Sequence, residues 1–355
     1  MHRPDPPAAP LMLGQRPVGS GHPTYVIAEA GVNHDGSVAR ALELVDVAAA
    51  AGADAVKFQV FRAAELASAA AGAARYQRAG GAASQRVLLA PLELDDDAFA
   101  RVAAHCRQHG IEFLATPFGV PDVARLESLG VRAIKIASTD LDNLPLLRRA
   151  AATGLPLIVS TGAATRDEIT TAVARLEQLG AGRRLALLHC VSSYPTPLDA
   201  ANLRAVATLA ATFGVPAGYS DHTAQIETGA WAVAAGAALL EKHFTHDRAA
   251  RGPDHAMSLD GSGLRAYIAA VRQVERSLGS GALGMTSLEA EVRAVARKSV
   301  VAARPLSAGM VLTPDALTTK RPGGGITPDQ LDALIGRRVA GDVPADTVLT
   351  WDMIQ

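Results

Sequence analysis

Two histidines stand in short segments that combine imidazole, hydroxyl and carboxylate side chains: His222 in GYSDHT and His243 in LLEKHFT. Each segment follows a short apolar run that predicts a buried strand. Because side chains on a strand alternate, Ser220 should share a face with His222, and Glu241 should share one with His243. Two neutral imidazoles with carboxylates nearby suit a divalent transition metal. Either histidine alone could be an unrelated residue near a strand end, so the interpretation depends on what surrounds the pair.

Two lysines lie inside otherwise apolar segments, Lys57 in AVKFQV and Lys135 in AIKIAS. A buried ammonium group is costly unless it meets an anion or forms a Schiff base. The anion could be a carboxylate of the protein, such as Glu29. The lysines could instead bind a phosphate and a carboxylate together with nearby hydroxyls, which donate to phosphoryl oxygens while ammonium groups supply charge. The candidate hydroxyls are those of Thr116, Ser138, Ser160 and Ser220.

The elements that must position these residues repeat one unit, a short apolar strand followed by a polar tip and an Ala/Leu-rich helix. The intervening helices show a 3.6-residue period, several end at Gly, and Thr165 and Glu168 have the spacing of a capping box. We expect eight strands, over residues 25–30, 55–60, 112–117, 133–138, 156–161, 185–190, 216–221 and 238–243. This alternation predicts an α/β fold, a (β/α)8 TIM barrel. A doubly wound open sheet is the alternative, but the Gly-rich first turn typical of it is not found.

Barrel enzymes carry their chemistry at the carboxyl ends of the strands. In this sequence an ionisable or hydroxyl side chain stands at the end of every predicted strand, whereas random placement would leave several ends apolar. The residues at these ends are Glu29, Asn33, Lys57, Gln59, Thr116, Lys135, Ser138, Ser160, Thr161, Ser192, Tyr194, Ser220, His222, Glu241 and His243. Together they predict one site with an anion-binding half and a metal-binding half.

The pattern changes along the chain and predicts four regions. Residues 1–17, with the Pro-rich stretch MHRPDPPAAP, are expected to be a disordered leader, and residues 18–285 the barrel domain. A charged helical linker over 286–298 leads to short β segments and turns over 299–355, a small β-rich domain. Within the barrel domain, the Ala/Gly-rich stretch 63–85 is expected to form an extended loop over the barrel mouth.

Composition excludes several classes of protein. The chain has 34 basic and 35 acidic residues, a net charge of −1, which indicates neither nucleic acid nor an anionic membrane as a partner. Two cysteines offer no disulfide framework, and no signal peptide or run of about 18 apolar residues occurs. We therefore expect a cytoplasmic protein.

The chain resembles the sialic acid synthase (N-acetylneuraminate synthase) family from about Val18 to the C-terminus. The motifs that carry the resemblance are IAEAGVNHDG, VKFQ, ATPF, KIAS, STG, LLHCVSSYPTP, YSDHT, EKHFT, GPDHAMSL, RKSVVA and KRPGGG. The resemblance implies a TIM barrel followed by a small antifreeze-like (SAF) domain. It also implies a domain-swapped homodimer in which the SAF domain of one subunit covers the barrel mouth of the other.

The activity implied by the resemblance is the metal-dependent condensation of phosphoenolpyruvate with an N-acylated amino sugar. His222 and His243 would hold Mn2+ (or Mg2+), and Glu29, with Glu241, could order the water that completes the reaction. Lys57 and Lys135 would be catalytic as well as binding residues. Phosphoenolpyruvate would be bound by Lys57, Thr116, Lys135, Ser138, Ser160, Ser192 and Ser220. The sugar would be bound by Gln59, Asp140, Tyr194 and Asp254, and by Arg321 of the partner subunit.

The sequence leaves the acceptor sugar and two other functions open. Asp140 stands where many relatives carry a Glu, so the sugar could be N-acetylmannosamine or a 2,4-diacetamido-trideoxyhexose. A pyruvate aldolase with Lys135 or Lys57 as the Schiff base is a second hypothesis. A non-catalytic carbohydrate- or ice-binding protein built around the small domain is a third.

The remaining polar residues have simpler interpretations. We interpret His189 as a core residue, Cys190 as packing, and His105 and His109 as surface residues. Asp254 and His255 could bond to substrate or form a turn.

Overall fold

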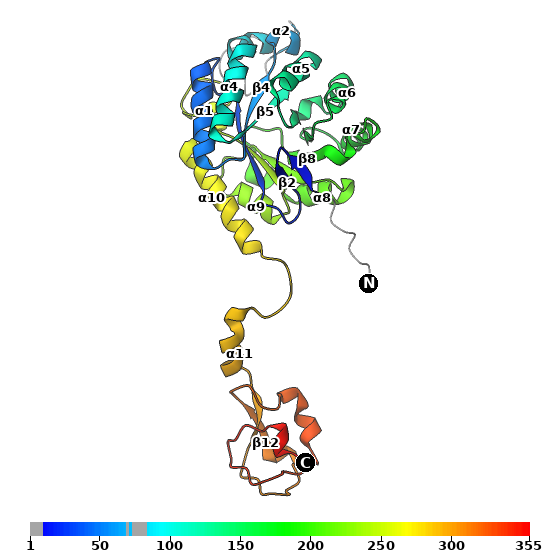
Figure 1. Cartoon of the computed structure of the whole chain (residues 1–355), viewed down its shortest axis with the longest axis vertical. Helices are drawn as coiled ribbons and strands as arrows, with labels where there is room; N and C mark the ends of the chain where they lie inside the picture. Colours follow the sequence, from blue (N-terminus) through cyan, green and yellow to red (C-terminus); the bar gives the residue numbers. More distant parts are fainter. Residues whose placement is uncertain (1–9, 69–70, 73–83) are drawn as a thin grey trace. The chain divides into compact units, whose positions relative to one another are not determined.

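The computed structural model describes residues 10–68, 71–72 and 84–355, and the chain divides into two compact units, Met1–Gly279 and Ser280–Gln355 (Figure 1). The first unit is built on one eight-stranded sheet in which every pairing is parallel. The sheet order is β5-β4-β3-β10-β9-β8-β7-β6, and β5 and β6 also lie beside one another, so the sheet curls into a nearly closed barrel. Its strands are β3 (Tyr25–Gly31), β4 (Ala55–Val60), β5 (Glu112–Pro117), β6 (Ile134–Ile136), β7 (Leu157–Ser160), β8 (Leu185–Cys190), β9 (Ala217–Asp221) and β10 (Leu239–His243). The predicted TIM barrel is thus confirmed.

Helices cover the outside of the barrel and bury their apolar faces against the sheet (Figure 1). Their ends follow the signals expected from sequence: Thr165 and Glu168 form the capping box that starts α7, and Gly52 and Gly110 end α1 and α4 in the left-handed conformation. The helices that pack on the sheet are α1 (Val38–Ala51), α4 (Asp96–His109), α5 (Val120–Leu129), α6 (Leu144–Ala152), α7 (Arg166–Gln178), α8 (Arg204–Phe213), α9 (Thr228–Ala234) and α10 (Gly261–Leu278). Two short helices, α2 (Ala63–Leu66) and α3 (Gln85–Leu89), lie in the segment between β4 and α4.

The expectation of a disordered leader over residues 1–17 was wrong for its second half. Strands β1 (Leu11–Leu13) and β2 (Arg16–Val18) form an antiparallel hairpin. Leu11, Leu13 and Val18 are buried in a cluster with the first residues of several barrel strands. These apolar side chains close the amino-terminal end of the barrel, where strand interiors would otherwise meet water. An ion pair between Arg16 and Asp54 ties the hairpin to the barrel.

The long segment between β4 and α4 is partly helical. Its start forms α2, whereas residues 69–70 and 73–83 of the predicted extended loop lie outside the described residues. The chain is described again from Ser84, whose hydroxyl caps α3.

The second unit has its own small core. Strands β11 (Ser299–Ala302) and β12 (Leu317–Lys320) pair antiparallel, and isolated bridges and short 3-10 turns make up most of the remainder. Val300, Leu312 and Leu349 are among its fully buried residues. The predicted linker contains helix α11 (Ala290–Ala296), preceded by a capping box between Thr286 and Glu289. Among the described residues, no helix is long and apolar enough to cross a membrane.

Candidate active site at the carboxyl ends of the barrel strands

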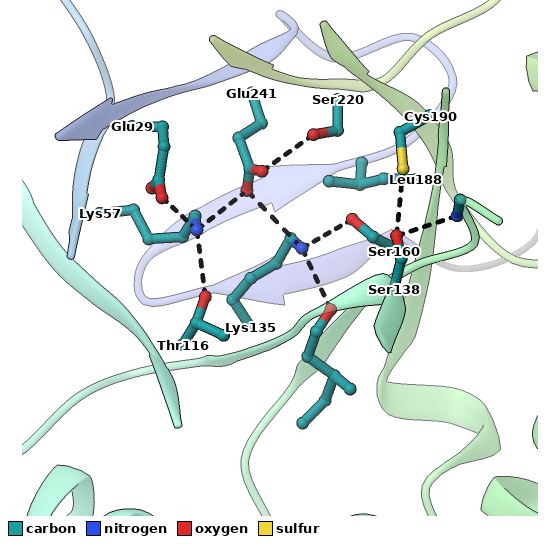
Figure 2. A network of polar contacts seen from close by, with 12 residues as sticks. Glu29, Lys57, Thr116, Lys135, Ser138, Ser160, Leu188, Cys190, Ser220 and Glu241 are labelled. Atoms are coloured by element: carbon teal, nitrogen blue, oxygen red, sulfur yellow. Dashed lines mark hydrogen bonds and ion pairs between the residues drawn. The ribbon is translucent and has the colours of Figure 1, made fainter. Parts of the chain in front are cut away.

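Glu241, on β10, lies between the two buried lysines that the sequence singled out (Figure 2). Its Oε2 is 3.7 Å from Lys57 Nζ on β4 and 3.8 Å from Lys135 Nζ on β6. Glu29, on β3, is closer to Lys57, with Oε2 2.8 Å from Nζ. All four side chains are buried. The barrel thus brings four charged groups from four strands into one network, including the Glu29–Lys57 pair that the sequence left as an alternative to substrate binding.

Each lysine also donates to a hydroxyl on the neighbouring part of the barrel (Figure 2). Lys57 Nζ donates to Thr116 Oγ1 at 3.0 Å, and Lys135 Nζ donates to Ser160 Oγ at 2.6 Å. Ser220 Oγ donates to Glu241 Oε1 at 2.9 Å. The predicted hydroxyls therefore line the same network, where they can donate to oxygens of an anion.

The two carboxylates of this network have opposite pKa shifts. Burial raises the pKa of Glu29 to about 7, even though Lys57 opposes the shift. Burial acts in the same direction on Glu241, but Lys135 and Lys57 together overcome it and lower its pKa to about 2. Glu241 is therefore a fixed anion, and Glu29 is poised to exchange a proton near neutral pH.

His222 and His243 lie beside each other at the ends of β9 and β10, with ring centroids 5.6 Å apart. Tyr194 packs against the pair, 4.2 Å from the His222 ring and 6.2 Å from the His243 ring, centroid to centroid. Burial lowers the pKa of both histidines, so both imidazoles are neutral at neutral pH. The structure thus joins the two histidines that were ambiguous as single residues.

The donor set of this pair fits a metal ion. His222 Nδ1 is 2.8 Å from the Val191 carbonyl oxygen and must donate to it, so Nε2 carries the lone pair. Ser220 Oγ lies 3.4 Å from Nε2 but gives its proton to Glu241, which leaves that lone pair for a ligand. His243 Nδ1 is buried and has no hydrogen-bond partner among the described residues. Asp254 Oδ2 lies 4.0 Å from that nitrogen, and burial raises the pKa of Asp254 to about 6. Two neutral imidazoles with a nearby carboxylate are ligands that divalent transition metals accept.

A buried ion pair lies behind the histidines, on the face of β9 and β10 that points away from the site. Lys242 Nζ is 3.2 Å from Asp221 Oδ2 and donates to the Thr223 carbonyl oxygen at 2.5 Å. Asp221 Oδ1 accepts from the backbone N–H and the hydroxyl of Thr223, at 2.9 and 2.7 Å. The Lys242 ammonium also lies 5.6 Å from the centre of the Tyr267 ring. Because Asp221 and Lys242 each precede a histidine, this pair fixes the two strand ends relative to each other; the sequence analysis assigned it no role.

At two glycines, polar side chains of the site occupy the space that a Cβ would take. A Cβ at Gly31 would lie 3.3 to 3.5 Å from Glu29 Oε1, Gln59 Nε2 and Asp254 Oδ2, so these three predicted residues converge there. Gln59 Nε2 donates to Glu29 Oε1 at 3.4 Å.

A Cβ at Gly162 would lie 2.5 Å from Cys190 Sγ and Ser192 Oγ and 3.0 Å from Ser138 Oγ. Ser138 Oγ accepts from the Gly162 N–H at 2.9 Å and is 3.1 Å from Cys190 Sγ. Ser138 and Ser192 thus meet at one point, and Cys190, which we interpreted as plain packing, lies beside them.

Other predicted residues are not joined to this network by the contacts described. Asp140 is hydrogen-bonded by Asn143 Nδ2 at 2.8 Å, and burial raises its pKa, but its partners belong to its own loop. Arg321 is an exposed residue of the second unit. His189, interpreted as a core residue, is satisfied by the Ala201 carbonyl oxygen at 3.0 Å.

His255 is buried and joins two loops through hydrogen bonds. Its Nδ1 is 2.6 Å from Thr245 Oγ1, and its Nε2 is 2.9 Å from Asp35 Oδ1. These hydrogen bonds hold the loop that carries Asp254. The sequence analysis missed several residues whose contacts depend on how β9 and β10 meet: Asp221, Thr223, Lys242 and Tyr267. It also missed the two glycines, Gly31 and Gly162. Charged residues that alternate with site residues on β9 and β10 were the available signal.

Comparisons with known proteins agree with this architecture. Residues 44–283 match the model of the NeuB family, and residues 297–355 match the model of the SAF domain. The N,N'-diacetyllegionaminic acid synthase of Legionella pneumophila is 38% identical to this chain, over 96% of this chain and 98% of that protein. The N-acetylneuraminate-9-phosphate synthase of Mus musculus is 31% identical over 95% of this chain and 94% of that protein.

Among solved structures, the N-acetylneuraminic acid (sialic acid) synthetase from Leptospira borgpetersenii serovar Hardjo-bovis, in complex with citrate, superposes with a TM-score of 0.73. It is 37% identical in sequence, and the match covers 80% of this chain and 95% of that chain. The chain therefore belongs to the NeuB family of enzymes and carries a C-terminal SAF domain.

Proposed function

We propose that this enzyme condenses phosphoenolpyruvate with an N-acylated amino sugar to give a nonulosonic acid and inorganic phosphate. The observation that carries the proposal is the position of Glu241, which contacts both buried lysines and Ser220 and stands two residues before His243 on the same strand. One side chain thus links an anion-binding half to the pair of imidazoles. Membership of the NeuB family supports this combination.

The anion-binding half suits phosphoenolpyruvate. Lys57 with Thr116, and Lys135 with Ser160, are two ammonium–hydroxyl pairs on neighbouring parts of the barrel. A phosphate and a carboxylate each accept charge-assisted hydrogen bonds of this kind. Ser138 and Ser192 at Gly162, and Ser220 beside Glu241, add further donors. We assign phosphoenolpyruvate to this half.

The pair His222 and His243 would hold a divalent cation, Mn2+ or Mg2+. When bound, the cation would act as a Lewis acid on the sugar aldehyde. The unpartnered Nδ1 of His243 and the acceptor Nε2 of His222 support this assignment. Glu241, anionic and close to both lysines, adds negative charge beside the pair.

In the reaction, the methylene carbon of phosphoenolpyruvate forms a bond to the aldehyde carbon, and the aldehyde oxygen takes up a proton. Water then adds to the cationic carbon that bears the phosphate, and the bond from that carbon to the bridging oxygen breaks as phosphate leaves. Glu29 is the group we assign to the water, because its pKa of about 7 lets it accept the proton that the water loses. Lys57, 2.8 Å from Glu29, holds that carboxylate in place.

The sugar would be bound by residues around the histidines and by the second domain of another subunit. Gln59 and Asp254 converge at Gly31, and Tyr194 packs on the histidine pair. We assign Asp140 and Arg321 of the partner subunit to the sugar as well, which requires a domain-swapped dimer. The identity of 38% to a synthase named for diacetyllegionaminic acid, against 31% to one named for N-acetylneuraminate 9-phosphate, favours a 2,4-diacetamido-trideoxyhexose as the acceptor.

The test is phosphate release from phosphoenolpyruvate over a panel of acceptors that includes N-acetylmannosamine and 2,4-diacetamido-trideoxyhexoses, with Mn2+ or Mg2+. We expect release with an acylated amino sugar, and loss of turnover by orders of magnitude in His222→Ala and His243→Ala. The matched control is His189→Ala, a strand histidine that the structure places outside the network. No release with any acceptor would overturn the function, and full turnover in both histidine variants would overturn the metal assignment.

The dimer has its own test. Where Arg321→Ala and Lys135→Ala are each inactive alone, their co-expression should restore about a quarter of the sites if Arg321 acts on the partner's barrel. The estimate assumes random pairing of two kinds of subunit, half of the dimers being mixed with one intact site each. Activity no higher than that of either variant alone would refute the swapped arrangement.

One observation favours the aldolase alternative. Burial lowers the pKa of Lys135, as a Schiff-base lysine requires. Against it, the Lys135 ammonium donates to Ser160 and to the Ile136 carbonyl oxygen and faces Glu241, which holds it as a cation. Borohydride with pyruvate would trap an aldolase covalently; we expect no adduct.

A further inference from the structure

Two helices on the outside of the barrel bring three ligand-type side chains together. Asp46 lies on α1, and His105 and His109 lie on α4, which packs beside α1. The two histidines are four residues apart, so they occupy the same face of α4 one turn from each other. This is the helical spacing with which paired histidines bind zinc in H-E-x-x-H sites.

The ligand atoms converge on one point. Asp46 Oδ1 is 2.6 Å from His105 Nε2 and 3.2 Å from His109 Nε2, and the two ring centroids are 4.5 Å apart. Within the described part of the chain, these are the three His, Cys, Asp or Glu side chains whose ligand atoms all lie within 4.8 Å of one another. The pair at the barrel mouth is a different set of residues on different elements.

An ordinary surface ion pair would explain less of this geometry. One carboxylate and one imidazole suffice for such a pair, which contributes about 0 to 1 kcal/mol when exposed. Here both Nε2 atoms lie within 3.2 Å of the same carboxylate oxygen. Around a tetrahedral zinc ion with bonds near 2.0 to 2.2 Å, ligand atoms lie about 3.3 Å apart. The observed separations of 2.6 and 3.2 Å need only a small outward shift of Asp46 to accept an ion.

The exposure of the three side chains allows an ion to enter while the helices hold the site in place. The exposed fractions are 50% for Asp46, 23% for His105 and 39% for His109. His105 is the most enclosed, and both histidines lie in the last two turns of α4, before it ends at Gly110. A fourth ligand position therefore faces water.

We propose that Asp46, His105 and His109 form a second divalent-metal site, separate from the barrel mouth, that takes Zn2+ or a similar borderline cation such as Co2+, Ni2+ or Cu2+. Two imidazoles and one carboxylate favour these ions over Mg2+ and Ca2+, which prefer sets of oxygen ligands. The ion bridges α1 and α4 and so stabilises the folded barrel by mass action, since the unfolded chain does not hold the three ligands together. The site does not depend on the proposed catalytic function.

The experiment titrates the metal-free full-length protein with Co2+ and Zn2+ and compares three variants. In wild type we expect Co2+ to give the visible absorption of a tetrahedral ion, and Zn2+ to raise the melting temperature. The variant His105→Gln/His109→Gln should lose one equivalent of bound metal and show a smaller Zn2+-dependent rise than wild type, yet keep its phosphate-release activity. The variant His222→Asn/His243→Asn should still bind the equivalent of metal held by Asp46, His105 and His109. Zn2+ should still raise its melting temperature. His22→Gln, a change at an exposed histidine outside both sets, should behave as wild type.

Two results would overturn the proposal. One is the same metal content and thermal response in His105→Gln/His109→Gln as in wild type. The other is binding of Zn2+ at this site more weakly than about 1 mM, the range of adventitious surface binding, where mass action adds almost nothing at micromolar metal.

Discussion

Removing the ammonium of Lys242 should destabilise the barrel more than any surface change, although this lysine points away from the active site. Its side chain is 1% exposed and that of Asp221 is 0% exposed. The substitution Lys242→Met keeps the unbranched apolar stem of the side chain and removes its ammonium group. Asp221 then remains as a buried carboxylate whose Oδ2 has no hydrogen-bond donor among the described residues.

The expected magnitude follows from the asymmetry of buried ion pairs. Removing one partner of such a pair costs about 3 to 5 kcal/mol, because it leaves an uncompensated charge in a medium of low polarity. Asp221 keeps the two bonds from Thr223 to its Oδ1, so we expect a loss near the lower end, about 3 kcal/mol. The double change Asp221→Asn/Lys242→Met removes both charges. It should cost only about 1 to 2 kcal/mol, which is the cost of the Thr223 carbonyl left without its donor.

The assay is urea unfolding of a Trp351→Phe background. Each unit contains one of the two tryptophans of the chain, so Trp231 on α9 then reports on the barrel unit. We compare the two single variants and the double variant in one thermodynamic cycle. A loss below about 1 kcal/mol in Lys242→Met would refute the reasoning. So would a double variant whose loss equals the sum of the single losses, since that means that the two charges do not interact.

Three further predictions concern the site and the amino-terminal end of the barrel. Glu29→Gln should lower kcat by about a hundredfold or more and abolish the ascending limb of the pH–rate profile near pH 7, because the base must lose its proton before it can act; an unchanged limb contradicts the role. Gly162→Ala should raise KM for phosphoenolpyruvate at least tenfold, because the added Cβ would lie 2.5 Å from two side chains. Gly284→Ala is the control, since a Cβ there meets no atom within 4 Å. The same KM in Gly162→Ala as in this control would exclude the crowding. In urea unfolding, Leu13→Ala should lower the free energy of unfolding by about 2 to 5 kcal/mol, as for a core leucine. An unchanged free energy of unfolding would mean that the hairpin does not pack on the barrel.

Much of the barrel and part of the site could be predicted because their signals are local. The eight expected strands agree with the observed ones to within one or two residues at each end, since apolar runs and polar tips alternate along the chain. Strand alternation also placed Glu241 with His243, and Ser220 with His222, on one face. The hairpin of Leu11 and Leu13 escaped prediction because a Pro-rich start looks disordered until the open end of the barrel is there to bury it.

Which side chains stand at the carboxyl ends of the strands can be read from the chain, because the two-residue period and the order of elements are local properties. Which of these side chains meet depends on the folded barrel. Lys57 and Lys135 are 78 positions apart (135 − 57 = 78), yet both face Glu241, and Lys242 pairs with Asp221 behind the histidines. Such partners, and the pKa values of Glu29 and Glu241 that follow from them, depend on distances through space and on burial, which arise only when the barrel closes.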